Sequence, residues 1–172
     1  VQQVIEKYNA DPEKVFLAGF SRGAIACNYI GLHNNEIAGI WAGFICHSHY
    51  DGVRNWGYSG ADRESALQRL QRLKNRPQWI SHESSVDSTQ SYLEQTGIFP
   101  NVTFLSLPFP NHTDQWVLKD TPAREKLRVW WSQHSRSHSQ ALEVQNLSKA
   151  ISEFQQKLIA DGECLSNAIQ VY

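Results

Sequence analysis

A serine between two glycines is the first side chain of this chain whose setting suggests chemistry. The segment Gly19-Phe20-Ser21-Arg22-Gly23 follows an apolar run and precedes a run with the character of a helix. A G-x-S-x-G segment between a strand and a helix is typical of a sharp turn that holds the serine hydroxyl clear of the sheet. Ser21 is therefore the candidate nucleophile, and the Arg22 backbone N–H at the helix start is the candidate oxyanion donor. We expect both glycines to be small because the backbones approach closely there.

A histidine far along the chain can supply the base that a serine nucleophile needs. His112 follows the last strand that we expect, 91 residues after Ser21, in a loop rich in proline and asparagine. Functional side chains in an open α/β sheet lie just beyond the carboxyl ends of the strands. We therefore predict that His112 folds back toward Ser21, the alternative being a surface histidine in a turn.

The elements that must position these side chains alternate between strand and helix. Apolar runs predict strands over residues 15–20, 37–46, 77–81 and 101–107. Helical patterns cover residues 1–8, 22–33, 88–95 and 123–131, with a further helix around residues 67–73. This alternation predicts an α/β fold with a mostly parallel sheet and helices on both faces.

The domain organisation follows from a change in composition near residue 132. Residues 1–131 form the predicted globular part, and residues 132–140 are polar and low in complexity, as in a linker. Residues 141–172 form a helical extension with apolar residues at helical spacing, namely Val144, Leu147, Ile151, Phe154 and Leu158. We expect this helix to dock on its own domain, and a partner-binding or coiled-coil helix is the alternative.

Composition excludes several classes of partner. The chain has 172 residues, enough for one domain with a core, and its 16 basic residues nearly balance 17 acidic ones. Such a balance gives no basic surface for nucleic acid or anionic membranes, and no apolar run reaches membrane-spanning length. The three cysteines match neither a disulfide framework nor a zinc pattern, and we expect Cys27 and Cys46 to be buried thiols.

Two sequence motifs carry a resemblance to a known family. The segments FLAGFSRGA and PNHTDQWVL, with the chain order Ser…Asp…His, resemble the α/β-hydrolase superfamily, and specifically bacterial esterases and polyester depolymerases. The resemblance covers roughly residues 1–131 and corresponds to the C-terminal half of such a domain. It implies acyl transfer to Ser21 with His112 as base and then acid. Because the chain starts at Val1 inside a helical pattern, we expect a piece of a longer protein, with the superfamily's second oxyanion donor upstream.

The acid that orients His112 has three candidates. Asp87 lies after the third expected strand, where the superfamily usually carries its acid, and we predict that Asp87 has this role. The segment departs from the family pattern, because Glu83 replaces a usual glycine and the aspartate falls one residue late. Asp87 also suits the N-cap of the following helix. Asp51, after the preceding strand, and Glu83 stay open as alternatives.

Aromatic and histidine side chains near the strand ends predict a substrate pocket. We expect Tyr50, Trp56 and Tyr58 to form its walls, with His47 as a polar contact to the substrate. The histidines at 47, 49 and 82 also suggest a metal site, but hydrogen-bonding roles are commoner, and we predict no metal and no cofactor. The Arg22 side chain either binds an anionic group of the substrate or pairs with a carboxylate.

Together these residues predict a serine hydrolase that cleaves small carboxylic esters through an acyl-enzyme intermediate. A serine peptidase of the prolyl-oligopeptidase-like type is the alternative enzyme, because such chains end in a similar domain. A non-catalytic binding protein on a hydrolase scaffold is the alternative of a different class. The sequence leaves the compartment and the oligomeric state open.

Overall fold

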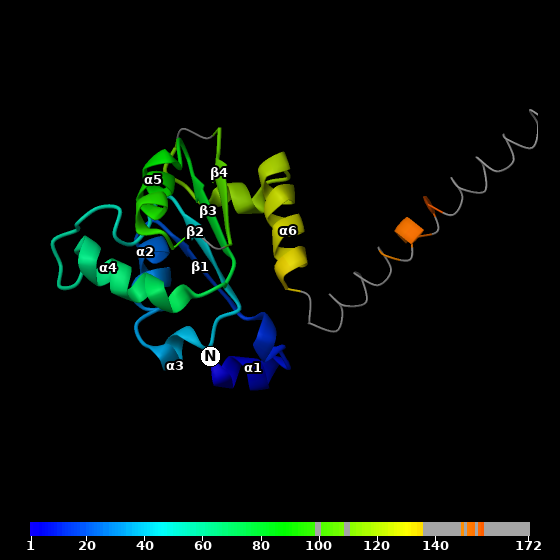
Figure 1. The fold of residues 1–172 in the computed structure, drawn as a ribbon, viewed down its shortest axis with the longest axis horizontal. Coiled ribbons are helices and arrows are strands. Elements are labelled where there is room, and N and C mark those ends of the chain that lie inside the picture. Colours follow the sequence, from blue (N-terminus) through cyan, green and yellow to red (C-terminus); the bar gives the residue numbers. More distant parts are fainter. Residues whose placement is uncertain (99–100, 109–110, 136–148, 150, 154, 157–172) are drawn as a thin grey trace, which may run out of the picture. The chain divides into compact units, whose positions relative to one another are not determined.

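A computed structural model describes residues 1–98, 101–108, 111–135, 149, 151–153 and 155–156 (Figure 1). The chain divides into two compact units, residues 1–135 and residues 136–172. Within the second unit the six described residues are helical, while Val144, Leu147, Phe154 and Leu158 of the predicted apolar stripe lie outside the described residues. The first unit contains the sheet and every side chain discussed below.

The first unit is built on a parallel sheet of four strands. In the order of the chain these are β1 (Phe16–Phe20), β2 (Gly43–His47), β3 (Gln78–His82) and β4 (Val102–Ser106), each hydrogen-bonded to the next. Parallel neighbours require a crossover connection, and helical segments supply it here. The predicted α/β fold with a parallel sheet is thus confirmed.

Helices cover both faces of this sheet. One face carries α2 (Arg22–Tyr29), α4 (Arg63–Leu70) and α5 (Asp87–Thr96), and the opposite face carries α6 (Pro122–His134) (Figure 1). The remaining helical segments are α1 (Gln2–Tyr8), α3 (Asn35–Ala38) and the 3₁₀ turns η1 (Pro12–Lys14), η2 (Gln71–Leu73) and η3 (Gln115–Leu118). None of the helices in the described part of the chain is long and apolar enough to cross a membrane.

Alternating side chains of each strand build two separate cores. On β2, Phe44 and Cys46 face the helices α2, α4 and α5, whereas Ile45 faces α6. On the α6 side, Trp79 and Trp130 are both buried and meet edge to face with ring centroids 5.8 Å apart. Because both faces are covered, apolar residues occur on both faces of the strands, which is why the strands could be recognised in the sequence.

Residues 37–46 differ from the prediction of a single strand. The Asn34 side chain accepts a hydrogen bond from the Ile37 backbone N–H at 2.8 Å and caps the short helix α3. The strand begins only at Gly43, where an added Cβ would press on the Phe16 ring and the Pro77 carbonyl. The first half of the apolar run is therefore a helix and a turn, and the prediction was wrong there.

Two helix boundaries also differ from the sequence prediction. α6 continues to His134, so the first three residues of the predicted linker over 132–140 are helical, and the His134 ring bonds the Trp130 carbonyl at 2.7 Å. α2 ends at Tyr29 rather than near residue 33, and the backbone then continues through turns to α3. Leu32 is buried although it lies outside the helix, whereas Ile30 is exposed, so the apolar character of these residues did not indicate continued helix.

Candidate active site

Ser21 occupies a strained turn between β1 and α2. Its backbone has φ 55° and ψ −120°, a region that residues with a Cβ rarely adopt. Its N–H donates to the His47 carbonyl at 3.0 Å, so the β1–β2 ladder continues one residue past the strand and holds the turn. A Cβ on Gly19 would overlap the Gly23 carbonyl, which confirms that Gly19 must be small. Gly23 differs from the prediction, because a Cβ there meets no described atom within 4 Å.

The structure brings Ser21 and His112 together. The Ser21 Oγ lies 2.9 Å from the His112 Nε2, and the His112 Nδ1 lies 2.6 Å from the Glu83 Oε1. A carboxylate can only accept, so the Nδ1 carries the proton that is donated to Glu83. The Nε2 is then the acceptor and faces the serine hydroxyl. Hydroxyl, imidazole and carboxylate form one continuous hydrogen-bonded row.

Glu83 is held ionised by its contacts. Burial alone raises the pKa of this carboxyl, but hydrogen bonds from His112, from backbone and from Ser48 outweigh it, and the pKa falls to about 2. The side chain of Glu83 is 11% exposed, against 49% for His112. A negative charge close to the His112 Nδ1 therefore persists across the neutral pH range.

Ser48 is a fourth contact of this row that sequence reasoning missed. Its hydroxyl donates to the Glu83 Oε1 at 2.9 Å and lies 3.1 Å from the His112 Nδ1. Ser48 directly follows β2 and has φ 82°, and its N–H bonds the Ser81 carbonyl at 2.8 Å. The available signal was its place just after a strand, as for Ser21 and Glu83. The positive φ that aims its side chain could not be read from the sequence.

His47 anchors the loop that carries His112. The Nε2 of His47 lies 3.0 Å from the Thr113 carbonyl and the Nδ1 lies 3.1 Å from the Ser81 hydroxyl. A carbonyl only accepts, so the Nε2 donates and links β2 to the residue after His112. Burial lowers the pKa of His47, which favours the neutral ring that these contacts need. With both nitrogens engaged, His47 has a positioning contact in place of the substrate contact that we expected.

The carboxylate beside His112 is Glu83 rather than Asp87. Asp87 is the exposed first residue of α5, where a negative charge suits the helix dipole. Asp51 lies elsewhere: its two oxygens accept from the Arg69 Nε and Nη2 at 2.8 and 3.1 Å. Of the three acidic candidates, only Glu83 contacts the imidazole among the residues that the structure describes.

The Asp51–Arg69 ion pair leads to a stability prediction. Both residues are buried, and burial raises the pKa of Asp51 although Arg69 acts to lower it. We expect Asp51→Asn to lower the free energy of unfolding by about 3–5 kcal/mol, because Arg69 would lose its charged partner while buried. Denaturant unfolding measures this, with the exposed Asp120→Asn as control. Equal stability of the two variants would show that the pair does not support the fold.

The other expected pocket residues separate into two groups. Trp56 lines a cavity beside α2 together with Arg22 and Tyr58, whereas Tyr50 is 2% exposed and donates its hydroxyl to the Gln78 Oε1 at 2.6 Å in the core. The His49 ring contacts both the cavity wall and the candidate base, with its centroid 5.1 Å from that of Trp56 and 5.5 Å from that of His112. Tyr50 therefore belongs to the hydrophobic core, and its hydroxyl is engaged there.

Metal-ligating side chains do not converge in this part of the molecule. Within residues 1–98, 101–108 and 111–135, no three side chains of His, Cys, Asp or Glu are grouped as a metal ion would require. The His82 Nδ1 accepts from the Ser84 backbone N–H at 3.0 Å, and both nitrogens of His47 are engaged within the protein. Cys27 and Cys46 are buried free thiols, as expected.

Comparison of the chain with known proteins found no relative. No family model, no curated protein and no solved structure matches the chain significantly. What is shown is an α/β structure with a parallel sheet, and a row of Ser21, His112 and Glu83 at the carboxyl ends of its strands.

Proposed function

We propose that this protein is a serine hydrolase that cleaves carboxylic esters through an acyl-enzyme intermediate. The observation that carries the proposal is the row in which the His112 Nε2 lies 2.9 Å from the Ser21 Oγ and the His112 Nδ1 lies 2.6 Å from Glu83. A hydroxyl, a base and an acid in this order and at these distances are the parts that acyl transfer requires.

Acylation begins with proton transfer from Ser21 to His112. As the Nε2 takes this proton, the Ser21 Oγ forms a bond to the ester carbonyl carbon, and the carbonyl oxygen becomes an oxyanion. The imidazolium is stabilised by the Glu83 carboxylate on its other side. The tetrahedral intermediate then breaks its bond to the alcohol oxygen, which leaves with the proton from His112.

Deacylation repeats the sequence with water. His112 takes a proton from water while the water oxygen bonds the acyl carbon, and the bond to Ser21 Oγ then breaks. The serine recovers its proton from His112 and the carboxylic acid leaves. Throughout, His47 and the Phe20 ring hold the imidazole in place, with the Phe20 and His112 centroids 4.6 Å apart.

The developing oxyanion faces the start of α2. Arg22 is the first residue of this helix, so its backbone N–H has no acceptor within the helix and is available to the oxyanion. The Ser21 N–H cannot serve, because it is bonded to the His47 carbonyl. The expected role of the Arg22 N–H thus forms part of the proposal.

Membership of the α/β-hydrolase superfamily is proposed on the same grounds. The motif around Ser21 supports it, as do the order Ser, acid, His along the chain and the strained turn at the end of β1. Ester and amide substrates compared on the same preparation would separate an esterase from a peptidase of this fold.

Labelling by a fluorophosphonate probe tests the proposal. We expect one covalent phosphonate on Ser21, and complete loss of labelling in Ser21→Ala, because the Ser21 hydroxyl faces the His112 Nε2, the acceptor nitrogen of the ring that Glu83 orients. The other strand-end serines that contact a histidine differ, because the Ser48 hydroxyl donates to Glu83 and Ser81 is buried. Intact-protein and peptide mass spectrometry measure it. Ser132→Ala removes an exposed hydroxyl on α6 and serves as control. Equal labelling of Ser21→Ala and the parent protein would refute the nucleophile.

A further inference from the structure

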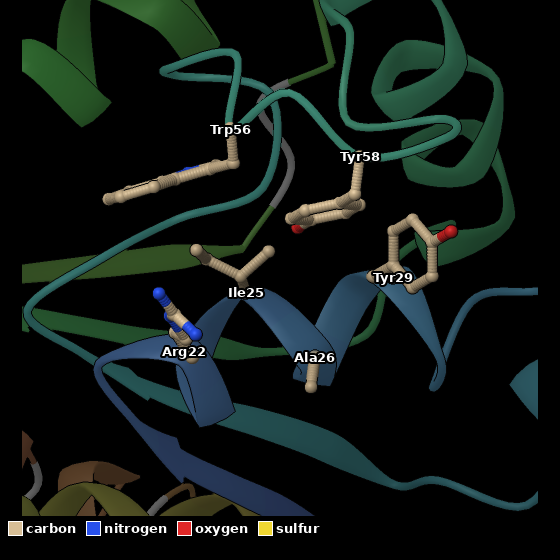
Figure 2. A pocket seen from close by; sticks show the side chains of 6 residues that line it. All are labelled: Arg22, Ile25, Ala26, Tyr29, Trp56 and Tyr58. Carbon is tan, nitrogen blue, oxygen red and sulfur yellow. The ribbon is translucent and has the colours of Figure 1, made fainter.

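A small cavity begins one residue after the proposed nucleophile. Its volume is about 330 Å³, and its floor is one face of α2, formed by residues at positions 22, 25, 26 and 29 (Figure 2). Its roof is the loop between β2 and α4, from which Trp56 and Tyr58 lie over the helix (Figure 2). The cavity thus extends along α2 from the same turn that holds Ser21.

The roof of this cavity is fixed to its floor. The Tyr29 hydroxyl donates to the Ser59 carbonyl at 2.8 Å, and the rings of Tyr29 and Tyr58 meet edge to face at 5.5 Å. The Arg69 Nη2 donates to the Gly60 carbonyl at 2.8 Å and secures the end of the same loop. The three aromatic walls are therefore preorganised, which reduces the entropy that a ligand must lose.

Arg22 is the one charged side chain among the described residues that line the cavity. Arg22 is exposed, and its guanidinium makes no ion pair or hydrogen bond with any described residue. In Figure 2 this guanidinium lies at the end of the cavity beneath Trp56. The Arg54 guanidinium lies 4.9 Å from the Trp56 ring and adds a second cation at the roof. Among the residues that the structure describes, no acidic side chain lines the cavity, and the nearby Asp51 is already paired with Arg69.

The volume, the aromatic walls and the positive charge of this cavity together indicate the kind of ligand that it can bind. A cavity of this volume is at the small end of ligand pockets, about 300–1,000 Å³, and suits one ring better than a long acyl chain. Aromatic walls favour an aromatic ring, and the planar fork of an arginine favours a carboxylate. We propose that the Arg22 cavity binds an aromatic carboxylate, so that the substrates are small esters carrying both an aromatic ring and a free carboxylate. The substrate assignment rests on the proposed hydrolase, whereas the binding of the acid does not.

Two methyl esters of equal shape test the substrate. Monomethyl terephthalate carries a carboxylate opposite the ester, and methyl 4-carbamoylbenzoate replaces it by a neutral amide. We expect kcat/KM to be about ten-fold higher for the anionic ester, since a charged hydrogen bond is stronger than a neutral one. Arg22→Gln keeps the backbone N–H and should bring the ratio close to one. Arg128→Gln, which removes an exposed charge from α6, should keep the parent ratio. A ratio near one in the parent protein would overturn the inference.

Benzoate binding to the Ser21→Ala variant tests the cavity without any turnover. Calorimetry should show binding that Arg22→Gln weakens about ten-fold and that Tyr58→Ala also weakens, while Tyr8→Ala, on α1, has no effect. Absence of benzoate binding would overturn the cavity assignment. Failure of the hydrolase would instead appear as absence of phosphonate labelling at Ser21 while benzoate still binds.

Discussion

Replacing Glu83 by glutamine should lower kcat/KM for ester hydrolysis by about a thousand-fold or more. The Glu83 Oε1 accepts the proton of the His112 Nδ1 at 2.6 Å, and this contact presents the Nε2 as the acceptor toward Ser21. A glutamine can turn its amide N–H toward the Nδ1, which stabilises the opposite tautomer and leaves no base at the serine. The imidazolium of the transition state also loses its negative partner. Steady-state kinetics on an activated ester measure the effect.

Asp87→Asn is the matched control for this variant. It removes the same charge four residues further on, but from an exposed position at the start of α5. We expect it to retain the parent kcat/KM. The opposite pattern, with activity lost in Asp87→Asn and kept in Glu83→Gln, would contradict the geometry described above. Unfolding curves of both variants show whether either change acts through stability.

Gly19→Ala should destabilise the fold by about 3 kcal/mol and remove most of the activity. The added Cβ would overlap the Gly23 carbonyl and press on the Ala24 backbone nitrogen, and these are backbone atoms that no rotamer change can move aside. The turn must therefore open, which moves the Ser21 Oγ away from the His112 Nε2. Denaturant unfolding and phosphonate labelling measure the two effects.

Gly23→Ala provides the comparison within the same motif. Nothing among the described atoms lies within 4 Å of a Cβ at this position, and Gly23 lies inside α2. Alanine is the better helix former, so we expect stability to be equal or to rise by about 0.5–1 kcal/mol. If Gly23→Ala were as damaging as Gly19→Ala, the steric difference between the two glycines would not hold.

The site could be located from the sequence because it follows the strand ends. Ser21, Ser48 and Glu83 are each the first residue after a strand, and His112 lies in the loop after the last strand. The position after a strand could not identify the acid that contacts His112, since Asp87, Asp51 and Glu83 all lie beyond strand ends. The longer Glu83 side chain starts beside the sheet and reaches the imidazole, whereas Asp87 is already part of α5. Whether an acid at this end of β3 can reach His112 therefore depends on the residue at which α5 begins, and the sequence does not define that residue closely enough.

The fold class was predictable for a similar reason, and its boundaries were not. Strands covered on both faces carry apolar residues on both faces, and four short runs of this kind are visible in the sequence. An apolar run alone does not distinguish a strand from a helix, so residues 37–42 were wrongly predicted as strand. The Asn34 side chain caps α3 there, and this favours the helix. Tyr50 shows the same limit for side chains, because a core tyrosine and a pocket tyrosine look alike in sequence.

The strands of this sheet lie side by side in the order in which they occur along the chain. Ser21 precedes β2, β3 and β4 in the sequence, so it is synthesised before them. His112, which is to activate the Ser21 hydroxyl, is synthesised only after β4. A chain that stops or misfolds before that point presents an ordinary, unreactive hydroxyl. On the proposed mechanism, the serine can react only after all four described strands have assembled.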